Sequence, residues 1–244
     1  MAKKKKKKST AKKPASSQKN AAPPKKKNSA LISFIIGLMA AIAVITTIAL
    51  IAAFTGGSGT GQQSSAASTE ASSTLEEGKT YFADIDIKDY GLITVELDQK
   101  AAPETVKNFI NLANSGFYDG LTFHRIMEGF MMQGGDPTAT GRGGSDKKIV
   151  GEFSENGYEN PISHVRGTIS MARSSGDYNS ASSQFFIVHK DSAFLDGKYA
   201  AFGKVTSGIE IVDKVCTDAK PTDNNGTIPF EQQPVINSIK IRES

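Results

Sequence analysis

Residues 123–136 read FHRIMEGFMMQGGD, and this stretch decides how the chain of 244 residues is interpreted. It combines one arginine, Arg125, with several apolar side chains and a single glutamine, Gln133. Successive side chains along a strand point to opposite faces, so one set can fill a core while the other lines a groove. The pattern therefore predicts short strands with one face packed in the core and the opposite face forming a binding surface.

Arg125 has two interpretations. Its guanidinium offers fixed, permanently charged donors that could act on a bound ligand. It could instead form an ordinary ion pair with a nearby acid such as Glu128, and surface pairs of that kind contribute little stability. Taken alone, the arginine favours the interpretation as an ion pair, whereas the surrounding motif favours a role in acting on a bound ligand.

Two later segments have a similar composition of aromatic, apolar and amide side chains. Residues 183–187 read SQFFI, and residues 194–198 read FLDGK. The amides of Gln133 and Gln184 can donate to and accept from a peptide backbone, or be satisfied internally. The apolar side chains can form a socket or belong to the ordinary core, and they are Phe130, Met131, Phe186 and Leu195.

Together these motifs resemble those of the cyclophilins, which are peptidyl-prolyl isomerases. The resemblance covers roughly residues 81–241. It implies a mainly β fold, namely a closed eight-stranded antiparallel barrel capped by two α-helices, with the site in a groove on the outer face. It also implies that the partners are proline-containing polypeptides. We expect neither a cofactor nor a metal, and we expect a monomer.

The resemblance also assigns roles to individual residues. Rotation about an X-Pro bond is opposed by a barrier of roughly 20 kcal/mol, because the nitrogen shares its lone pair with the carbonyl. Arg125 matches the family's catalytic arginine and would direct an N–H at the prolyl nitrogen in the twisted state. The implied substrate-binding residues are Phe130, Met131, Gln133, Ala172, Arg173, Gln184, Phe186, Phe194, Leu195 and Tyr199.

Three of these positions depart from the pattern of many eukaryotic cyclophilins. Phe194 stands where those members have a tryptophan tied to tight cyclosporin binding, so sensitivity to that drug is in doubt. Tyr199 replaces a histidine and keeps an aromatic wall. Arg173 stands where an asparagine is usual, and its added positive charge could favour acidic or phosphate-free extended peptides of a particular sequence.

The histidines and the glycine runs do not indicate metal or phosphate chemistry. His124, His164 and His189 are spaced widely and irregularly, unlike a compact zinc pattern. The glycine run at residues 141–144 lacks the lysine and hydroxyl of a phosphate-binding loop. The side chain of His124 should face the interior of the barrel, because its neighbour Arg125 faces out.

The N-terminal region predicts where the enzyme works. Residues 1–30 hold twelve lysines and no acid, so the remaining 214 residues carry about −8 of the formal total of +4. Residues 31–54 are 24 residues without a charge, long enough to span a membrane as a helix at ~1.5 Å per residue. The lysine run could bind nucleic acid, but beside such a segment anionic lipid head groups are the simpler partner.

The lysines before the apolar segment predict a cytoplasmic tail and an extracellular catalytic domain on a single-pass protein of the cell membrane. A cleaved signal peptide and a buried core helix are the alternatives. The length and uniform apolarity of residues 31–54, without a clean small-x-small site, favour an uncleaved signal-anchor transmembrane helix. Residues 55–78 are then a flexible Ser/Gly/Thr linker, and residues 79–244 are the isomerase domain.

Periodicity within the domain predicts many strands and two helices. The helices are expected at 103–114 and 207–215. Strands are expected at 91–97, 121–126, 130–133, 168–172, 184–188, 201–205 and 235–241. This composition indicates a barrel or a sandwich, and only the resemblance chooses the barrel.

Cys216 is the only cysteine, so the domain has no internal disulfide and the thiol is expected to be a small buried group. This suits a Gram-positive-type exterior. The leading interpretation is an anchored isomerase that assists the folding of secreted or surface proteins. A non-catalytic module that binds proline peptides, and a scaffold that docks a surface partner, are the alternatives.

Overall fold

The computed structural model describes residues 75–76 and 78–244. The predicted tail, the predicted membrane span and almost all of the predicted linker lie outside these residues. Within them, no helix combines the length and apolarity needed to cross a membrane.

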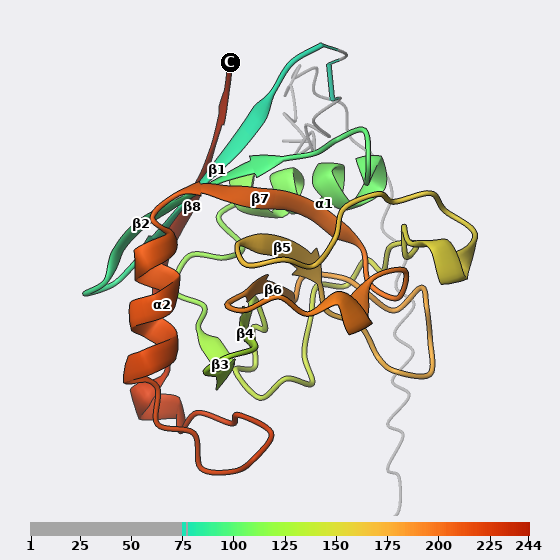
Figure 1. The fold of residues 1–244 in the computed structure, drawn as a ribbon. Coiled ribbons are helices and arrows are strands. Elements are labelled where there is room, and N and C mark those ends of the chain that lie inside the picture. Colours follow the sequence, from blue (N-terminus) through green and yellow to red (C-terminus); the bar gives the residue numbers. More distant parts are fainter. Residues whose placement is uncertain (1–74, 77) are drawn as a thin grey trace, which may run out of the picture. The chain divides into compact units, whose positions relative to one another are not determined.

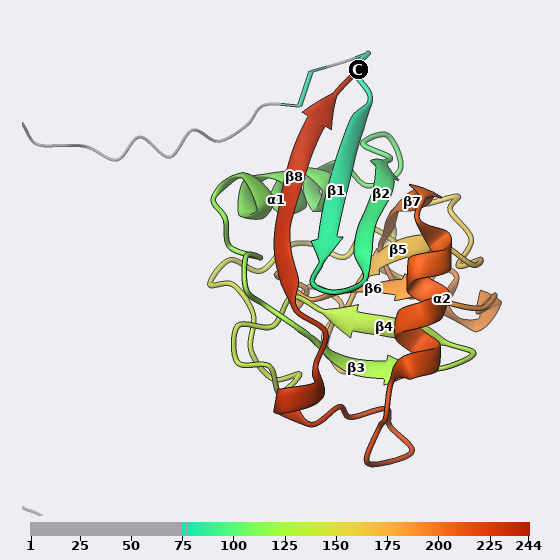
Figure 2. The same ribbon diagram turned by 90° about the vertical axis from the view of Figure 1, so that its left-hand side faces the viewer.

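The described part of the chain is mainly β, as predicted. Eight antiparallel strands form one sheet in the order β3-β4-β6-β5-β7-β2-β1-β8. Figure 2 shows β8, β1 and β2 running upright while β3, β4, β5 and β6 cross them, so the sheet curls strongly. The strands are β1 (Tyr81–Ile87), β2 (Gly91–Leu97), β3 (Phe123–Met127), β4 (Met131–Gly134), β5 (Thr168–Met171), β6 (Phe185–Val188), β7 (Ala201–Ser207) and β8 (Ile236–Glu243).

The prediction of a fully closed barrel is wrong. Strands β3 and β8 stand at the two ends of the strand order, and the segments that lead into them meet at a bridge between Thr122 and Val235. Beyond that bridge the outer edge of β3 is bonded by an irregular segment, because Ile126 donates its N–H to the carbonyl of Gly226 at 2.8 Å. This segment lies where β8 would have to run to close the ladder, so the curled sheet stays open.

Two α-helices cover the sheet (Figure 1), α1 (Pro103–Asn114) and α2 (Ile209–Asp218). The first agrees with the predicted range. The second begins two residues later than predicted, because Ser207 ends β7 and Gly208 takes a φ of +81° as the N-cap. Short 3-10 turns lie at Ser154–Asn156, Ala193–Leu195 and Phe230–Gln232.

The sheet carries apolar side chains on both faces, and this alternation positions the site. In β6, Phe185 and Ile187 belong to the main core, whereas Phe186 belongs to a smaller cluster on the other face. In β4, Met132 joins the main core and Met131 the smaller cluster. The predicted division between core residues and groove residues is therefore confirmed.

The predicted burial of His124 and Cys216 is also confirmed. His124 is 5 % exposed and Cys216 is 1 % exposed. Burial, with smaller effects of Asp213 and Glu128, raises the pKa of the Cys216 thiol to about 12. The thiol therefore stays protonated at neutral pH and packs as a small apolar group.

Candidate active site

A pocket of about 160 Å³ opens on the face of the sheet that carries the smaller cluster. Nine of the predicted site residues line it, and they are Arg125, Phe130, Met131, Gln133, Ala172, Arg173, Phe186, Leu195 and Tyr199. Two predicted residues lie at its margins. Gln184 lines a neighbouring pocket, and Phe194 packs against Phe130 with 5.5 Å between ring centroids.

The apolar floor of this pocket is firmly supported. Phe186 is 5 % exposed, and its ring stacks on that of His164 at 6.0 Å with an interplanar angle of 18°. His164 is held in turn, because Nδ1 lies 2.8 Å from Asp196 and Nε2 lies 3.0 Å from the hydroxyl of Ser170. The edge of the Tyr199 ring meets Phe186 at 5.9 Å. The His164 ring that supports Phe186 therefore cannot turn without breaking its two hydrogen bonds.

Arg125 is carried by β3 and lines the pocket. Its Nε donates to the carbonyl of Asn225 at 2.7 Å, and Nη1 donates to Oε1 of Gln133 at 3.2 Å. The guanidinium carbon lies 5.8 Å from the ring centroid of Phe130. None of the ion pairs between described residues involves Arg125, so the structure does not support pairing with Glu128.

A relay of amides continues from Arg125 along the groove. Nε2 of Gln133 donates to Oε1 of Gln184 at 2.9 Å, and Nε2 of Gln184 donates to the carbonyl of Gly143 at 2.7 Å. Each amide nitrogen has a second N–H. The relay therefore fixes the orientation of the amides and still leaves donors for a peptide backbone.

Arg125 stays positively charged although its side chain is partly buried. Burial lowers the pKa of the guanidinium, and Tyr199 and Asp223 oppose that change. An arginine remains charged at neutral pH even so. Because the site is partly shielded from water, each N–H interaction with a ligand is stronger than on an open surface.

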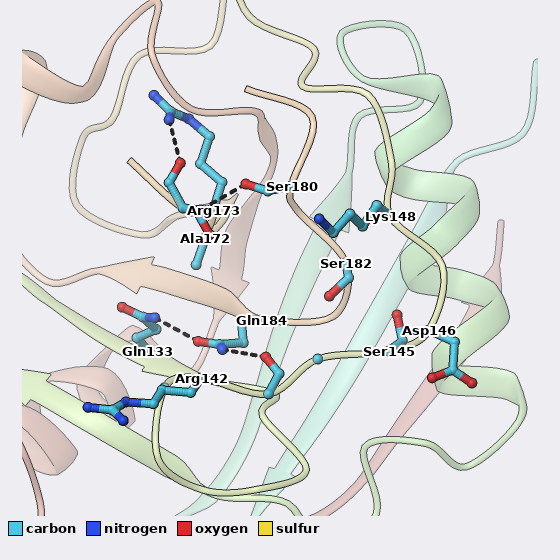
Figure 3. Close-up of a pocket in the computed structure, with 14 residues that line it drawn as sticks. Gln133, Arg142, Ser145, Asp146, Lys148, Ala172, Arg173, Ser180, Ser182 and Gln184 are labelled. Carbon is cyan, nitrogen blue, oxygen red and sulfur yellow. Dashed lines mark hydrogen bonds between the residues drawn. The ribbon is translucent and has the colours of Figure 1, made fainter. Parts of the chain in front are cut away.

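Arg173 does not present its charge to the groove as its sequence position suggests. Its guanidinium carbon lies 4.8 Å from the ring centroids of Tyr178 and Tyr199, and Nε donates to the carbonyl of Lys198 at 2.9 Å. Figure 3 shows this guanidinium directed away from Gln184 and Lys148. Arg173 lines both pockets, and its guanidinium supports the ring of Tyr199.

Several contributors to the site were absent from the sequence prediction. The carbonyl of Asn225 is a backbone group, so no side-chain motif could reveal it. The glycine run at residues 141–144 permits close backbone approach and so suits a loop that borders a peptide groove. This loop does border the neighbouring pocket of about 580 Å³, whose lining also includes Arg142 and Lys148, and these two side chains were not predicted.

A permanently charged donor beside a cluster of buried apolar side chains, with two amide side chains along the groove, suits the recognition of extended prolyl peptides. The family model of cyclophilin type peptidyl-prolyl cis-trans isomerases matches residues 82–243. A peptidyl-prolyl cis-trans isomerase of Helicobacter pylori strain J99 is 44 % identical over 142 residues, which cover 57 % of this chain and 83 % of that protein. Peptidyl-prolyl cis-trans isomerase B of Bacillus subtilis is 49 % identical over 124 residues, covering 51 % of this chain and 82 % of that protein.

Solved structures agree with these sequence matches. A cyclophilin type peptidyl-prolyl cis-trans isomerase of Cryptosporidium parvum, crystallised in the presence of the dipeptide Ala-Pro, superposes with a TM-score of 0.57 at 31 % identity. The superposition covers 67 % of this chain and 99 % of that one. The chain therefore belongs to the cyclophilin-type peptidyl-prolyl cis-trans isomerases.

Proposed function

We propose that the substrate proline ring enters the pocket floored by Met131, Phe186 and Leu195, with Arg125 acting at its mouth. The observation that carries this proposal is the position of the Arg125 guanidinium in the lining of a pocket of about 160 Å³ whose buried side chains Met131, Phe186 and Leu195 are apolar. The pyrrolidine ring offers apolar surface that such a floor can remove from water. Proline-containing polypeptides are therefore the substrate class.

Arg125 acts on the prolyl nitrogen. In the planar ground state that nitrogen shares its lone pair with the carbonyl, which produces the rotation barrier of roughly 18–20 kcal/mol. As the bond twists, the lone pair localises on nitrogen and becomes a better acceptor. A guanidinium N–H directed at this nitrogen stabilises the twisted state more than the planar one, which is the condition for catalysis.

The neighbouring groups hold the peptide while one side of the bond rotates. The free N–H groups of Gln133 and Gln184 bind the peptide backbone, and Ala172 leaves space for its approach. Tyr199 supplies a wall of the proline pocket. Because the Arg125–Gln133 hydrogen bond and the Asn225 carbonyl already orient the guanidinium, little reorganisation accompanies the twist.

The sequence supports a particular working place for this activity. We infer that residues 31–54 form a signal-anchor helix, with the lysine-rich residues 1–30 in the cytoplasm and the isomerase domain outside the cell membrane. On that side the monomeric domain accelerates slow prolyl steps in the folding of secreted or surface proteins. Support comes from the charge asymmetry and the uncharged length of the segment.

An exchange assay on an X-Pro peptide tests the catalytic proposal. The full chain should raise the cis–trans exchange rate measured by NMR, and Arg125→Ala should lower kcat/KM by about 10²- to 10³-fold. Peptide affinity should change far less. If the unmutated chain binds the peptide without raising its exchange rate, the chain is a binding module and the catalytic role of Arg125 is wrong.

Protease protection tests the proposed location. With epitopes at both ends of the full chain, protease added to intact cells should remove the C-terminal epitope and spare the N-terminal one. Recovery of the chain in the soluble fraction, or protection of both epitopes, would contradict the signal-anchor proposal without affecting the catalytic one.

A further inference from the structure

The hairpin that joins β3 to β4 carries two side chains that contact the guanidinium of Arg125. Nη2 of Arg125 lies 3.3 Å from the sulfur of Met127, and the guanidinium carbon lies 5.8 Å from the ring centroid of Phe130. Glu128 and Gly129, which connect these two residues, are exposed, so the turn has little packing of its own. The position of Phe130, which lines the proline pocket, therefore depends on the hydrogen bonds that hold the turn.

His189, the residue that follows β6, supplies hydrogen bonds to this turn. Its Nδ1 accepts from the N–H of Gly129 at 2.9 Å, and its own backbone N–H donates to the carbonyl of Phe130 at 2.8 Å. The two bonds lie on either side of the peptide that links Gly129 to Phe130. A single residue thus holds the turn with both its side chain and its backbone.

The other ring nitrogen of His189 faces α2, which crosses the end of the β3–β4 hairpin (Figure 2). Nε2 lies 3.4 Å from Oδ1 of Asp213, and this carboxylate also binds the guanidinium of Arg166. The side chain of His189 is 15 % exposed. Because Nδ1 has to offer a lone pair to the N–H of Gly129, the arrangement requires a neutral imidazole that carries its proton on Nε2.

Protonation of this imidazole would break the hydrogen bond to the turn. A proton on Nδ1 would place a second donor against the N–H of Gly129, and Nδ1 is the acceptor recorded for that N–H among the described residues. The other ionisable groups around the imidazole lie in the turn, after β6, before β5 and one turn either side of Asp213 on α2, and they are Glu128, Lys190, Asp191, Arg166, Glu210 and Cys216.

We propose that His189 is a positioning residue of this isomerase, and that its neutral imidazole holds the turn and, through Phe130 and Met127, the guanidinium of Arg125. The inference rests on the proposed function, because it assumes that Arg125 acts on the prolyl nitrogen and that Phe130 borders the bound proline. It follows that mild acid lowers the catalytic rate of the folded protein, since a histidine gains its proton in that range.

Two substitutions on the full chain separate the roles of the two ring nitrogens. His189→Asn places an amide oxygen where Nδ1 stood and keeps an acceptor for Gly129, whereas His189→Gln extends toward Asp213 and removes that acceptor. The substrate is an Ala-Pro peptide blocked at both ends, so that it does not titrate. At about pH 7.5 we expect kcat/KM to fall roughly twofold to tenfold in His189→Gln, the range of one hydrogen bond, and to be largely recovered in His189→Asn.

The pH profile distinguishes positioning from a purely structural role. Between about pH 7.5 and pH 5.5 the unmutated chain should lose activity toward the level of His189→Gln, because a histidine changes its charge in this range. His189→Asn should lose less, since its amide does not titrate, while His124 and His164 contribute to both proteins alike. Rates are measured well below the thermal unfolding midpoint at each pH, so that the protein stays folded.

Lys190→Gln is the matched control for the change beside the turn. This exposed neighbour forms no ion pair recorded among the described residues, and only its backbone groups take part in the recorded hydrogen bonds. It should follow the pH profile of the unmutated chain.

The two proposals fail in different ways. Equal rates for His189→Asn and His189→Gln at about pH 7.5, or an equal loss of activity in acid by His189→Asn and the unmutated chain, would overturn the positioning role alone. No acceleration of the peptide by the unmutated chain at either pH would overturn the proposed function on which it rests.

Discussion

The Nε of Arg125 donates a 2.7 Å hydrogen bond to the carbonyl of Asn225, which lies 100 positions further along the chain. The turn that holds Asn225 is organised by Asp223, whose Oδ1 accepts from the N–H groups of Asn225 at 2.9 Å and Thr227 at 3.0 Å. Gly226 in this turn has a φ of +87°, and a Cβ there would lie 2.5 Å from Met127. A loop distant in sequence therefore sets the direction of the guanidinium.

Arg125→Lys should not preserve the activity. A lysine is a single flexible ammonium, so it cannot bind Asn225, Gln133 and the substrate with the fixed geometry of a guanidinium. We expect kcat/KM to fall about tenfold or more, in the direction of Arg125→Ala, because one preorganised donor is lost. The assay is paired with a thermal unfolding midpoint, and full activity in Arg125→Lys would show that positive charge alone is sufficient.

Asp223 should be a positioning residue that acts through Arg125. Asp223→Ala removes the acceptor of the turn, and we expect kcat to fall roughly tenfold, since small misplacements of a catalytic group are costly. KM should change little, and Asp223→Asn, which keeps an acceptor oxygen, should recover part of the rate.

Asn224→Ala is the control for Asp223, because this exposed side chain in the same turn forms no hydrogen bond recorded among the described residues. It should retain the original kcat. A parallel rise in KM and loss of kcat in Asp223→Ala would show that the turn contacts the substrate directly.

Local patterns predicted much of the fold and the site because they depend on neighbouring side chains. The alternation in residues 184–188 identified which phenylalanine faces the groove, and the proline and apolar stripe of residues 103–114 defined α1. Strand β1 is absent from the predicted strands, although its sequence YFADIDI alternates in burial.

Features that depend on distant backbone groups were not predictable from the residues. The barrel stays open beside β3 because the edge of this strand is hydrogen-bonded to the irregular segment at Gly226 instead of to β8. These bonds use backbone groups, so no side-chain pattern indicates them. The orientation of Arg173 depends on three rings from separate parts of the sequence, those of Phe153, Tyr178 and Tyr199. The sequence placed Arg173 at the groove, but these ring contacts could not be predicted from its charge.

Glu152 should stabilise the fold through the start of α1. Its side chain accepts from the N–H of Glu104 at 3.0 Å and from both the N–H and the hydroxyl of Thr105, at 2.8 and 2.7 Å. The N-cap residue Ala102 cannot provide such an acceptor. Glu152→Gln places an amide donor against these buried donors, so we expect a loss of about 1–3 kcal/mol in the free energy of unfolding.

Urea denaturation measures this loss, and Glu159→Gln is the control because Glu159 is exposed and forms no ion pair recorded among the described residues. The control should unfold at the original midpoint. Equal midpoints for Glu152→Gln and the unmutated chain would show that the helix start does not depend on this carboxylate.

His124 should make the stability fall in mild acid. Burial lowers the pKa of its imidazole below the ordinary 6.5, Asp136 opposes this and Arg125 adds to it. Because the unfolded chain binds the proton more readily, the contribution of neutral His124 is complete above pH 6.5 and is lost as the pH falls below that value.

Neither ring nitrogen of His124 has a hydrogen-bond partner among the described residues, so His124→Leu leaves no buried group unpaired. Urea midpoints at about pH 7.5 and pH 5.5 should therefore differ less in His124→Leu than in the unmutated chain, while His164, whose pKa is also lowered by burial, contributes equally to both. An identical pH dependence in the two proteins would show that His124 does not titrate on unfolding in this range.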